Sequence, residues 1–144
     1  MLQAKRILVP LAGNSTDADI MALACYLAKR DRAKIYAINV IEVKRTLPLD
    51  AELHDETARG EAILEQAERV AAQWNQEIES EILQARDVGT AIVDEAIERN
   101  IDLILLGVVY KRRFGEFDLG RTVPYVLKNA PCRVWVCREP MSEG

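Results

Sequence analysis

The stretch that most constrains the fold is the apolar run DLILL at residues 102–106, which leads directly into Gly107. A short apolar run that ends at a turn residue is typical of a strand buried on both faces, as in a parallel sheet. Glycine adopts backbone conformations that other residues avoid, so we expect a tight turn at Gly107. This stretch therefore predicts a central strand of an α/β sheet.

The residues after Gly107 complete one structural unit. We expect a polar and basic loop as far as Leu119, then a short helix that begins at Gly120 and ends before Pro131. The apolar residues of this helix are spaced i, i+3, i+4 and i+7, as on one helix face: Val123, Val126, Leu127 and Ala130. The alternation of apolar and other residues over Arg133–Arg138 predicts a last strand whose outer positions carry charge.

Further strands and helices are predicted before this unit. Strands are expected at residues 5–10, 33–41 and 77–83, and helices from a cap at Ser15, Thr16 or Asp17 to about residue 32, at residues 51–75 and at residues 90–99. Glutamates occupy alternate positions of residues 77–83, which indicates an edge strand that charge protects from pairing with another sheet. The alternation of strands and helices predicts a parallel α/β sheet.

The loop between Gly107 and Gly120 is a candidate phosphate site. Glycine lets backbone N–H groups come close to an anion, and a helix N-terminus offers N–H donors without partners. Glycines also occur in strand–loop–helix connections where they serve only the turn. The residues by themselves leave both interpretations open.

The composition argues against several classes of protein. With 144 residues, 49% of them hydrophobic, we expect one domain over residues 1–140 and a short mobile tail at residues 141–144. The net charge of −4 argues against a general nucleic-acid-binding protein. No stretch approaches the roughly 20 apolar residues of a membrane-spanning helix, and the N-terminus lacks the apolar core of a signal peptide. We expect a soluble, cytoplasmic protein without membrane insertion.

The cysteines and the histidine predict no metal site and no catalytic group. Three cysteines without CxxC spacing form neither a disulfide framework nor a zinc knuckle. His54 is the only histidine, which excludes sites built from several histidines and argues against a Ser-His-Asp triad.

Three segments resemble the universal stress protein family in their order and spacing, and the resemblance covers almost the whole chain: RILVP at residues 6–10, DLILLG at 102–107 and GRTVPYVLKNAPCRVWVCR at 120–138. The resemblance implies a universal stress protein domain over residues 1–140. Its fold would be a single open five-stranded parallel sheet of strand order 3-2-1-4-5 with helices on both faces, Rossmann-like and similar to the adenine nucleotide alpha hydrolases. It also implies a homodimer formed through the last strand, Arg133–Arg138.

Many members of this family bind ATP at a G-x2-G-x9-G-[ST] loop. On this chain the first and third glycines fall on Gly107 and Gly120, the second falls on Tyr110, and the Ser/Thr position falls on Arg121. A large side chain at residue 110 would stand where the backbone should pass close to phosphate. This departure puts ATP binding in doubt while leaving the resemblance in fold intact.

Two further ligand positions come from the resemblance. The family's P-x-D pattern after the first strand falls on Pro10, Leu11 and Ala12, so the chain lacks a carboxylate that would help to hold the nucleotide or its metal. Val40, at the end of the second strand, corresponds to a valine that packs on the adenine. Because strands one and four would be neighbours where the strand order reverses, the residues after Pro10 should meet Gly107 at one crevice.

Cations are concentrated at the same loop. The loop and the helix start carry four of them, Lys111, Arg112, Arg113 and Arg121, and arginine can bind a phosphate through two hydrogen bonds. An ordinary solvated basic loop is the alternative. Arg86 and Asp87, after the third strand, could reach the crevice or pair with each other, and we favour the pair.

The predicted ligand is ATP or another adenine nucleotide, held in a modified pocket. The candidate binding residues are Pro10, Leu11, Ala12, Val40, Gly107, Tyr110, Arg113, Gly120, Arg121 and Thr122. The leading hypothesis is a non-enzymatic regulatory module of the universal stress type. The alternative is a nucleotide-independent interaction module that regulates a partner such as an amino-acid transporter, because IEVKRTLPLDAEL at residues 41–53 resembles stress-protein domains attached to some amino-acid permeases. Slow nucleotide hydrolysis is a third reading.

Overall fold

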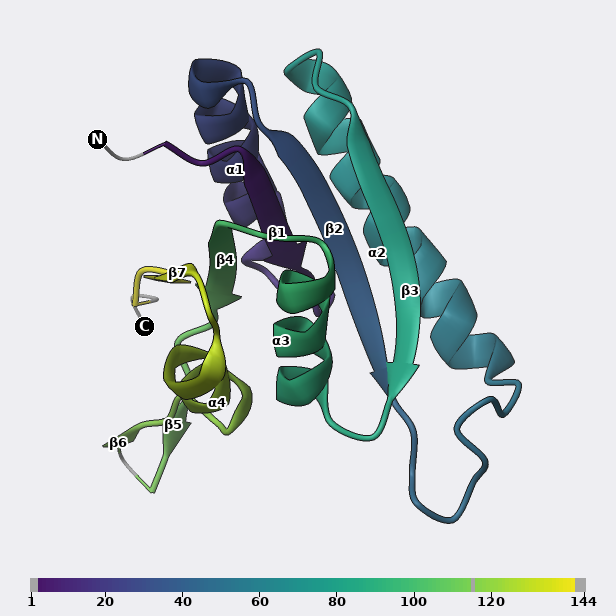
Figure 1. Cartoon of the computed structure of the whole chain (residues 1–144). Helices are drawn as coiled ribbons and strands as arrows, with labels where there is room; N and C mark the ends of the chain where they lie inside the picture. Colours follow the sequence, from purple (N-terminus) through teal and green to yellow (C-terminus); the bar gives the residue numbers. More distant parts are fainter. Residues whose placement is uncertain (1–2, 115, 142–144) are drawn as a thin grey trace.

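The alternating apolar runs and amphipathic segments form an α/β sheet flanked by helices (Figure 1). The computed structural model describes residues 3–114 and 116–141. Its elements, in chain order, are β1 (Arg6–Pro10), α1 (Asp17–Asp31), β2 (Lys34–Glu42), α2 (His54–Gln73), β3 (Ile78–Ala85), α3 (Val88–Glu98), β4 (Leu103–Val108), β5 (Arg112–Arg113), β6 (Glu116–Phe117), α4 (Thr122–Asn129) and β7 (Arg133–Arg138).

The main sheet has five parallel strands in the order β3-β2-β1-β4-β7. Numbered along the chain, this is the predicted order 3-2-1-4-5, so the predicted fold class is confirmed. In the central strand β1, Ile7, Leu8 and Val9 are all fully buried. Ile7 and Val9 point to one face of the sheet and Leu8 points to the other, as the two-residue period of a strand requires.

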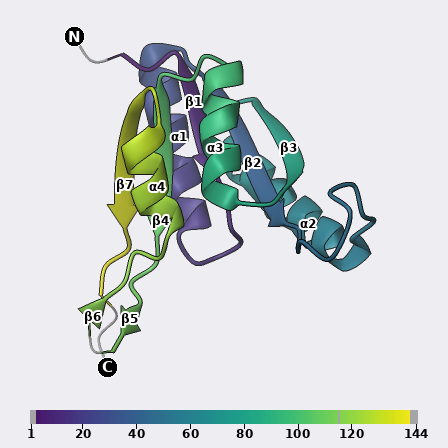
Figure 2. The same ribbon diagram turned by 60° about the horizontal axis from the view of Figure 1, so that its bottom comes forward.

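Helices cover both faces of the sheet. Figures 1 and 2 show α1 and α2 on one face and α3 and α4 on the other. Each pair of helices closes one of two hydrophobic layers, and the central strands contribute side chains to both layers. None of the helices within the described ranges combines the length and apolar character needed to cross a membrane.

The predicted turn at Gly107 is wrong. Strand β4 continues through Gly107 to Val108, and Gly107 stands opposite Cys137 of β7. The glycine serves packing instead, because a Cβ atom there would collide with the side chain of Thr16 at the start of α1. The absent side chain lets α1 approach the sheet closely.

The predicted irregular loop after β4 contains a short antiparallel ribbon. In the ribbon Arg112 pairs with Phe117. Figure 2 shows this β5–β6 ribbon extending beyond the end of β4, away from the sheet. Tyr110 and Phe117 stack with ring centroids 5.3 Å apart and an angle of 11° between the planes. The stacking stabilises a ribbon that is too short to show a periodic sequence pattern.

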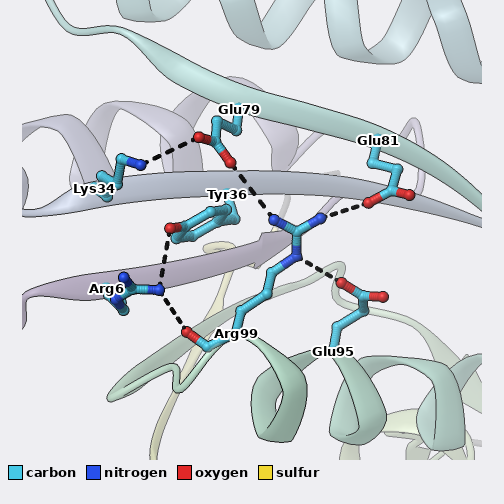
Figure 3. A network of polar contacts seen from close by, with 7 residues as sticks. All are labelled: Arg6, Lys34, Tyr36, Glu79, Glu81, Glu95 and Arg99. Carbon is cyan, nitrogen blue, oxygen red and sulfur yellow. Dashed lines mark hydrogen bonds and ion pairs between the residues drawn. The ribbon is translucent and has the colours of Figure 1, made fainter.

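The predicted edge position of the third strand is confirmed, since β3 pairs only with β2 among the described strands. Its glutamates have a further role. Figure 3 shows Glu79 and Glu81 directed at Arg99, which follows α3 and lies over the ring of Tyr36. The glutamates therefore attach β3 to the end of α3, in addition to protecting the edge strand from pairing with another sheet.

The chain end follows β7. Met141 is half exposed, and the rest of the predicted tail, residues 142–144, falls outside the described residues.

Candidate functional site

A hollow of about 550 Å³ opens at the carboxyl end of β4, beside the start of α4. We call it the β4 hollow. It is lined by Asn14, Gly107, Val108, Val109, Lys111, Arg112, Asp118, Leu119, Gly120, Thr122 and Val123. Three of the predicted ligand residues, Gly107, Gly120 and Thr122, thus come together at one place.

Gly120 gives the β4 hollow its open backbone. Its φ of +68° is a conformation that favours glycine, and no heavy atom lies within 4 Å of the position that a Cβ atom would take. The Gly120 N–H donates a hydrogen bond of 2.9 Å to Oδ1 of Asp118. An anion that binds over this backbone therefore competes with the Asp118 carboxylate for one donor.

The start of α4 adds further backbone donors. The N-cap residue Arg121 makes no side-chain capping hydrogen bond. Within the described residues, the side chain of the N-cap residue therefore accepts no hydrogen bond from the N–H groups of Thr122 and Val123. Two N–H groups and the positive end of the helix dipole are available to an anion at this wall of the hollow.

Lys111 and Arg112 supply the positive charge of the β4 hollow. Nε of Arg112 donates to the hydroxyl of Tyr110 at 3.2 Å, and its guanidinium carbon lies 5.8 Å from the centre of that ring. Tyr110 therefore helps to position a cation of the hollow.

The side chain of Tyr110 does not crowd the hollow, contrary to the prediction. The ring stacks on Phe117, and the guanidinium carbon of Arg138 lies 5.0 Å from its centre. The backbone N–H of Tyr110 donates to Oε1 of Glu139 at 3.0 Å. Contacts with Arg138 of β7 and with Phe117 of the ribbon hold the ring outside the hollow. Tyr110 therefore supports the ribbon and positions Arg112. Arg113 belongs to β5, but its side chain lies outside the part of the chain that the structure describes.

The predicted meeting of the residues after β1 with Gly107 is confirmed only for Asn14, because Pro10, Leu11 and Ala12 do not line the β4 hollow. Leu11 is buried. Its N–H donates to the carbonyl of Ile38, and its carbonyl accepts from the side-chain amide of Asn39. Ala12 is exposed, and its carbonyl accepts a 2.8 Å hydrogen bond from Arg59 of α2. Pro10 ends β1 half-buried. Of this loop, Asn14 is the residue that reaches the hollow.

The groups that hold this loop have no clear signal in the sequence. Oδ2 of Asp17 accepts a 2.9 Å hydrogen bond from the N–H of Gly13. Burial raises the pKa of Asp17, while the surrounding backbone N–H groups and Arg59 act in the opposite direction. The sequence pattern predicts Asp17 only as a helix cap, and nothing in the local pattern connects Arg59, in the middle of an amphipathic helix, with Ala12.

Arg121 points away from the β4 hollow. Its Nη2 lies 2.7 Å from Oε1 of Glu42, at the end of β2. This ion pair lies at a second hollow of about 430 Å³, which we call the β2–β3 hollow. It is lined by Glu42, Val43, Lys44, Arg45, Arg86, Asp87 and Arg121. Val40 lines neither hollow: it is half-buried and packs on the layer formed with α3 and α4.

Arg86 and Asp87 do not pair with each other as predicted. Nη1 of Arg86 donates to the carbonyl of Lys44 at 2.6 Å. The carboxylate of Asp87 caps α3 through the N–H and the hydroxyl of Thr90, each at 2.8 Å, and these bonds lower the pKa of Asp87. Both residues nevertheless line the β2–β3 hollow.

Known proteins share this sequence and fold. A model of the universal stress protein family matches residues 3–138. Universal stress protein MJ0531 of Methanocaldococcus jannaschii is 30% identical over 145 residues, which cover 96% of this chain and 85% of that protein.

Solved structures agree with this match. Universal stress protein UspA from Lactobacillus plantarum has a TM-score of 0.74 and 26% identity, covering 96% of this chain and 100% of that one. The universal stress protein from Archaeoglobus fulgidus in complex with dAMP has a TM-score of 0.72 and 16% identity, covering 94% and 98%. The chain therefore belongs to the universal stress protein family.

Proposed function

We propose that this protein is a regulatory module that binds an adenine nucleotide in the β4 hollow and does not act as an enzyme. The observation that carries the proposal is the composition of the hollow: the open backbone at Gly120, the start of α4, and the cations Lys111 and Arg112. The dAMP complex of the Archaeoglobus fulgidus protein supports an adenine nucleotide as the ligand class.

The phosphate would lie against the start of α4. The N–H groups of Thr122 and Val123 would donate to its oxygens, and Lys111 and Arg112 would balance its charge. The hydrogen bond between Asp118 and Gly120 would break or shift when the phosphate binds. Binding would therefore be coupled to the conformation of the segment that connects the ribbon to α4.

The residues of the β4 hollow support a binding role. Among the described residues that line it, Asp118 is the only carboxylate, and there is no histidine or cysteine. Asp118 is engaged with the Gly120 N–H, so it is poorly placed to act as a general base.

We further propose that the protein forms a homodimer through β7. This strand lies at the edge of the sheet and pairs with β4 on one side. Val136 of β7 is 37% exposed. Pairing with the same strand of a second copy would satisfy the outer backbone groups and cover this apolar side chain.

An interaction module that works without a nucleotide is the second candidate. The observation that favours it is the apolar surface of the β5–β6 ribbon, where Phe114 is 93% exposed and Phe117 and Leu119 are each 39% exposed. Such side chains on a projecting ribbon suit contact with a partner protein, for example a transporter.

Native mass spectrometry of freshly purified protein, followed by calorimetric titration with AMP, dAMP and ATP, tests the leading proposal. We expect a nucleotide adduct or a measurable affinity. Arg112→Ala should weaken binding about tenfold or more, because a charge-assisted hydrogen bond contributes about 1.5–3 kcal/mol. Lys128→Ala, which removes a cation from the last turn of α4, is the matched control.

Two results would contradict the nucleotide proposal. One is a protein that carries no adduct and binds none of the three nucleotides, which would favour the interaction module. The other is equal nucleotide affinity of Arg112→Ala and the Lys128→Ala control, which would place the binding site elsewhere.

A further inference from the structure

The β2–β3 hollow has an excess of positive charge. Among its described lining residues are four cations, Lys44, Arg45, Arg86 and Arg121, but only two carboxylates. Both carboxylates are engaged, Glu42 with Arg121 and Asp87 with the start of α3. Within the described ranges, no carboxylate pairs with Lys44, Arg45 or Arg86. Three cations at one hollow are thus free of acidic partners.

The backbone of this hollow is organised before any ligand binds. The N–H of Val43 donates to the carbonyl of Ala85 at 2.8 Å, and Arg86 donates to the carbonyl of Lys44. The N–H of Leu47 closes a turn on the same Lys44 carbonyl at 3.0 Å. These bonds attach the turn that carries Lys44 and Arg45 to the end of β3. An anion bound there would not have to order the turn first.

Adjacent residues at the start of α4 line the two hollows. Gly120 and Thr122 line the β4 hollow, and Arg121, between them in the chain, lines the β2–β3 hollow. Consecutive Cα atoms are about 3.8 Å apart, so the backbone walls of the two hollows are adjacent at Arg121, and one small molecule that passes over this residue would reach both. The side chain of Arg121 is 79% exposed. Its guanidinium can therefore leave the Glu42 carboxylate and bind a phosphate without any buried side chain having to move.

We propose that the β2–β3 hollow is a second anion subsite, and that the ligand is an adenine nucleotide with two phosphate groups at separate positions of the nucleoside. This inference rests on the proposed nucleotide function of the β4 hollow. One phosphate lies at the start of α4, and the second lies among Lys44, Arg45 and Arg121. A single phosphate chain occupies the β4 hollow alone.

Calorimetric titration with three probes tests the inference: AMP, ADP and adenosine 3′,5′-bisphosphate, all at one ionic strength. AMP has one phosphate. ADP has two on one side of the ribose, and the bisphosphate has them on two sides. We expect the bisphosphate to bind at least tenfold more tightly than AMP or ADP. Each additional charge-assisted contact is sufficient for such a factor.

Two double variants assign the effect to the hollow. Lys44→Ala with Arg45→Ala removes two exposed cations of the subsite, and we expect it to abolish the advantage of the bisphosphate while AMP affinity stays unchanged. Arg69→Ala with Lys128→Ala removes the same charge at the ends of α2 and α4 that lie away from the carboxyl edge of the sheet. This control should keep the advantage.

The failures of the two proposals can be told apart. If none of the three nucleotides binds, the proposed function fails and this inference fails with it. If AMP binds but the bisphosphate has no advantage over AMP or ADP, only the second subsite is overturned. An advantage that persists in the Lys44→Ala, Arg45→Ala variant also overturns the subsite.

Discussion

Single residues fix how closely the first helix and the first strand approach their neighbours. Gly107 leaves room for Thr16 at the start of α1, and Asp31, the last residue of that helix, bonds to the chain before β1. Oδ2 of Asp31 accepts a 2.9 Å hydrogen bond from the N–H of Ala4, and Oδ1 lies 2.8 Å from Nε of Arg30. The two ends of α1 are thus held by groups that are far from them in the sequence.

Replacement of Gly107 tests the close approach of α1 to the sheet. We expect Gly107→Ala to lower the free energy of unfolding by about 1–3 kcal/mol, since the new Cβ atom would lie 2.9 Å from Cβ of Thr16 and still closer to its hydroxyl. Thr16→Gly in the same chain should restore part of the loss, because it removes both colliding atoms. Urea denaturation of the two single variants and the double variant measures this coupling, and strictly additive losses would refute the contact.

Asp31 should make stability depend on acid pH. The hydrogen bond from Arg30, and next that from the Ala4 N–H, lowers the pKa of Asp31 from 3.8 to about 2. A carboxyl group whose pKa is lower in the folded protein stabilises it above its unfolded pKa. This contribution is lost as the pH falls from about 3.8 towards 2.

Unfolding of Asp31→Asn as a function of pH measures this loss. The variant should be less stable than the natural chain at pH values above 3.8, and the difference should shrink as the pH approaches 2. Asp94→Asn, on an exposed position of α3, is the charge-matched control. A stability difference that does not change with pH would contradict the role of Asp31.

Ion pairs attach the edge strand β3 to the end of α3 (Figure 3). Nε of Arg99 lies 2.7 Å from Glu95 of α3, and its two other nitrogens lie 3.5 Å from Glu79 and 2.5 Å from Glu81 of β3. The guanidinium carbon is 4.9 Å from the centre of the Tyr36 ring. An arginine can serve three carboxylates and a ring at once because its guanidinium is planar and forked.

Removal of Arg99 should loosen this edge. We expect Arg99→Ala to lower the free energy of unfolding by about 1–2 kcal/mol, a value kept small because the glutamates of β3 are about half exposed. Arg99→Lys should recover little, since an ammonium group lacks the fork. Arg69→Ala, whose guanidinium bonds to Gln66, is the control for loss of an exposed arginine.

Urea denaturation at low and high salt tests the electrostatic origin of the effect. Salt screens partly exposed pairs, so the difference between Arg99→Ala and the natural chain should fall at high salt. A loss no larger than that of Arg69→Ala would show that the cluster contributes little to holding β3.

Charge is distributed unevenly over the protein. The chain has a net charge of −4, yet the two hollows at the carboxyl edge of the sheet hold Lys44, Arg45, Arg86, Lys111, Arg112 and Arg121. A basic edge on an acidic molecule attracts small anions without favouring long nucleic acids. The apolar edge at β7 is a separate surface, suited to the proposed second copy.

A change at Val136 tests assembly through β7. We expect the natural chain to form a dimer at micromolar concentration and Val136→Lys to form a monomer, because the new charge would meet its copy and the neighbouring arginines across the interface. Leu127→Lys, at a 51% exposed position of α4, should leave the dimer intact. Light scattering after size exclusion gives the masses; a monomeric natural chain would refute the dimer.

Parts of the candidate site could be predicted from the sequence. The meeting of Gly107, Gly120 and Thr122 followed from the strand order and the family resemblance, and the structure brings them together in the β4 hollow. The directions of Tyr110 and Arg121 could not be predicted in this way. Tyr110 stacks within the ribbon, and Arg121 pairs with Glu42, 79 residues earlier in the chain.

The order of strands and helices along the chain, the parallel sheet and the edge position of β3 could all be predicted from the sequence. These features depend on the period of apolar and charged residues and on turn residues, which act over short stretches of chain. Three features depend on tertiary contacts instead: the continuation of β4 through Gly107, the hydrogen bonds from Asp17 and Arg59 that hold the loop after β1, and the division of the basic edge into two hollows. Each of these arises where side chains from distant segments meet, as when Arg59 of α2 bonds to the carbonyl of Ala12, and no local pattern encodes such a meeting.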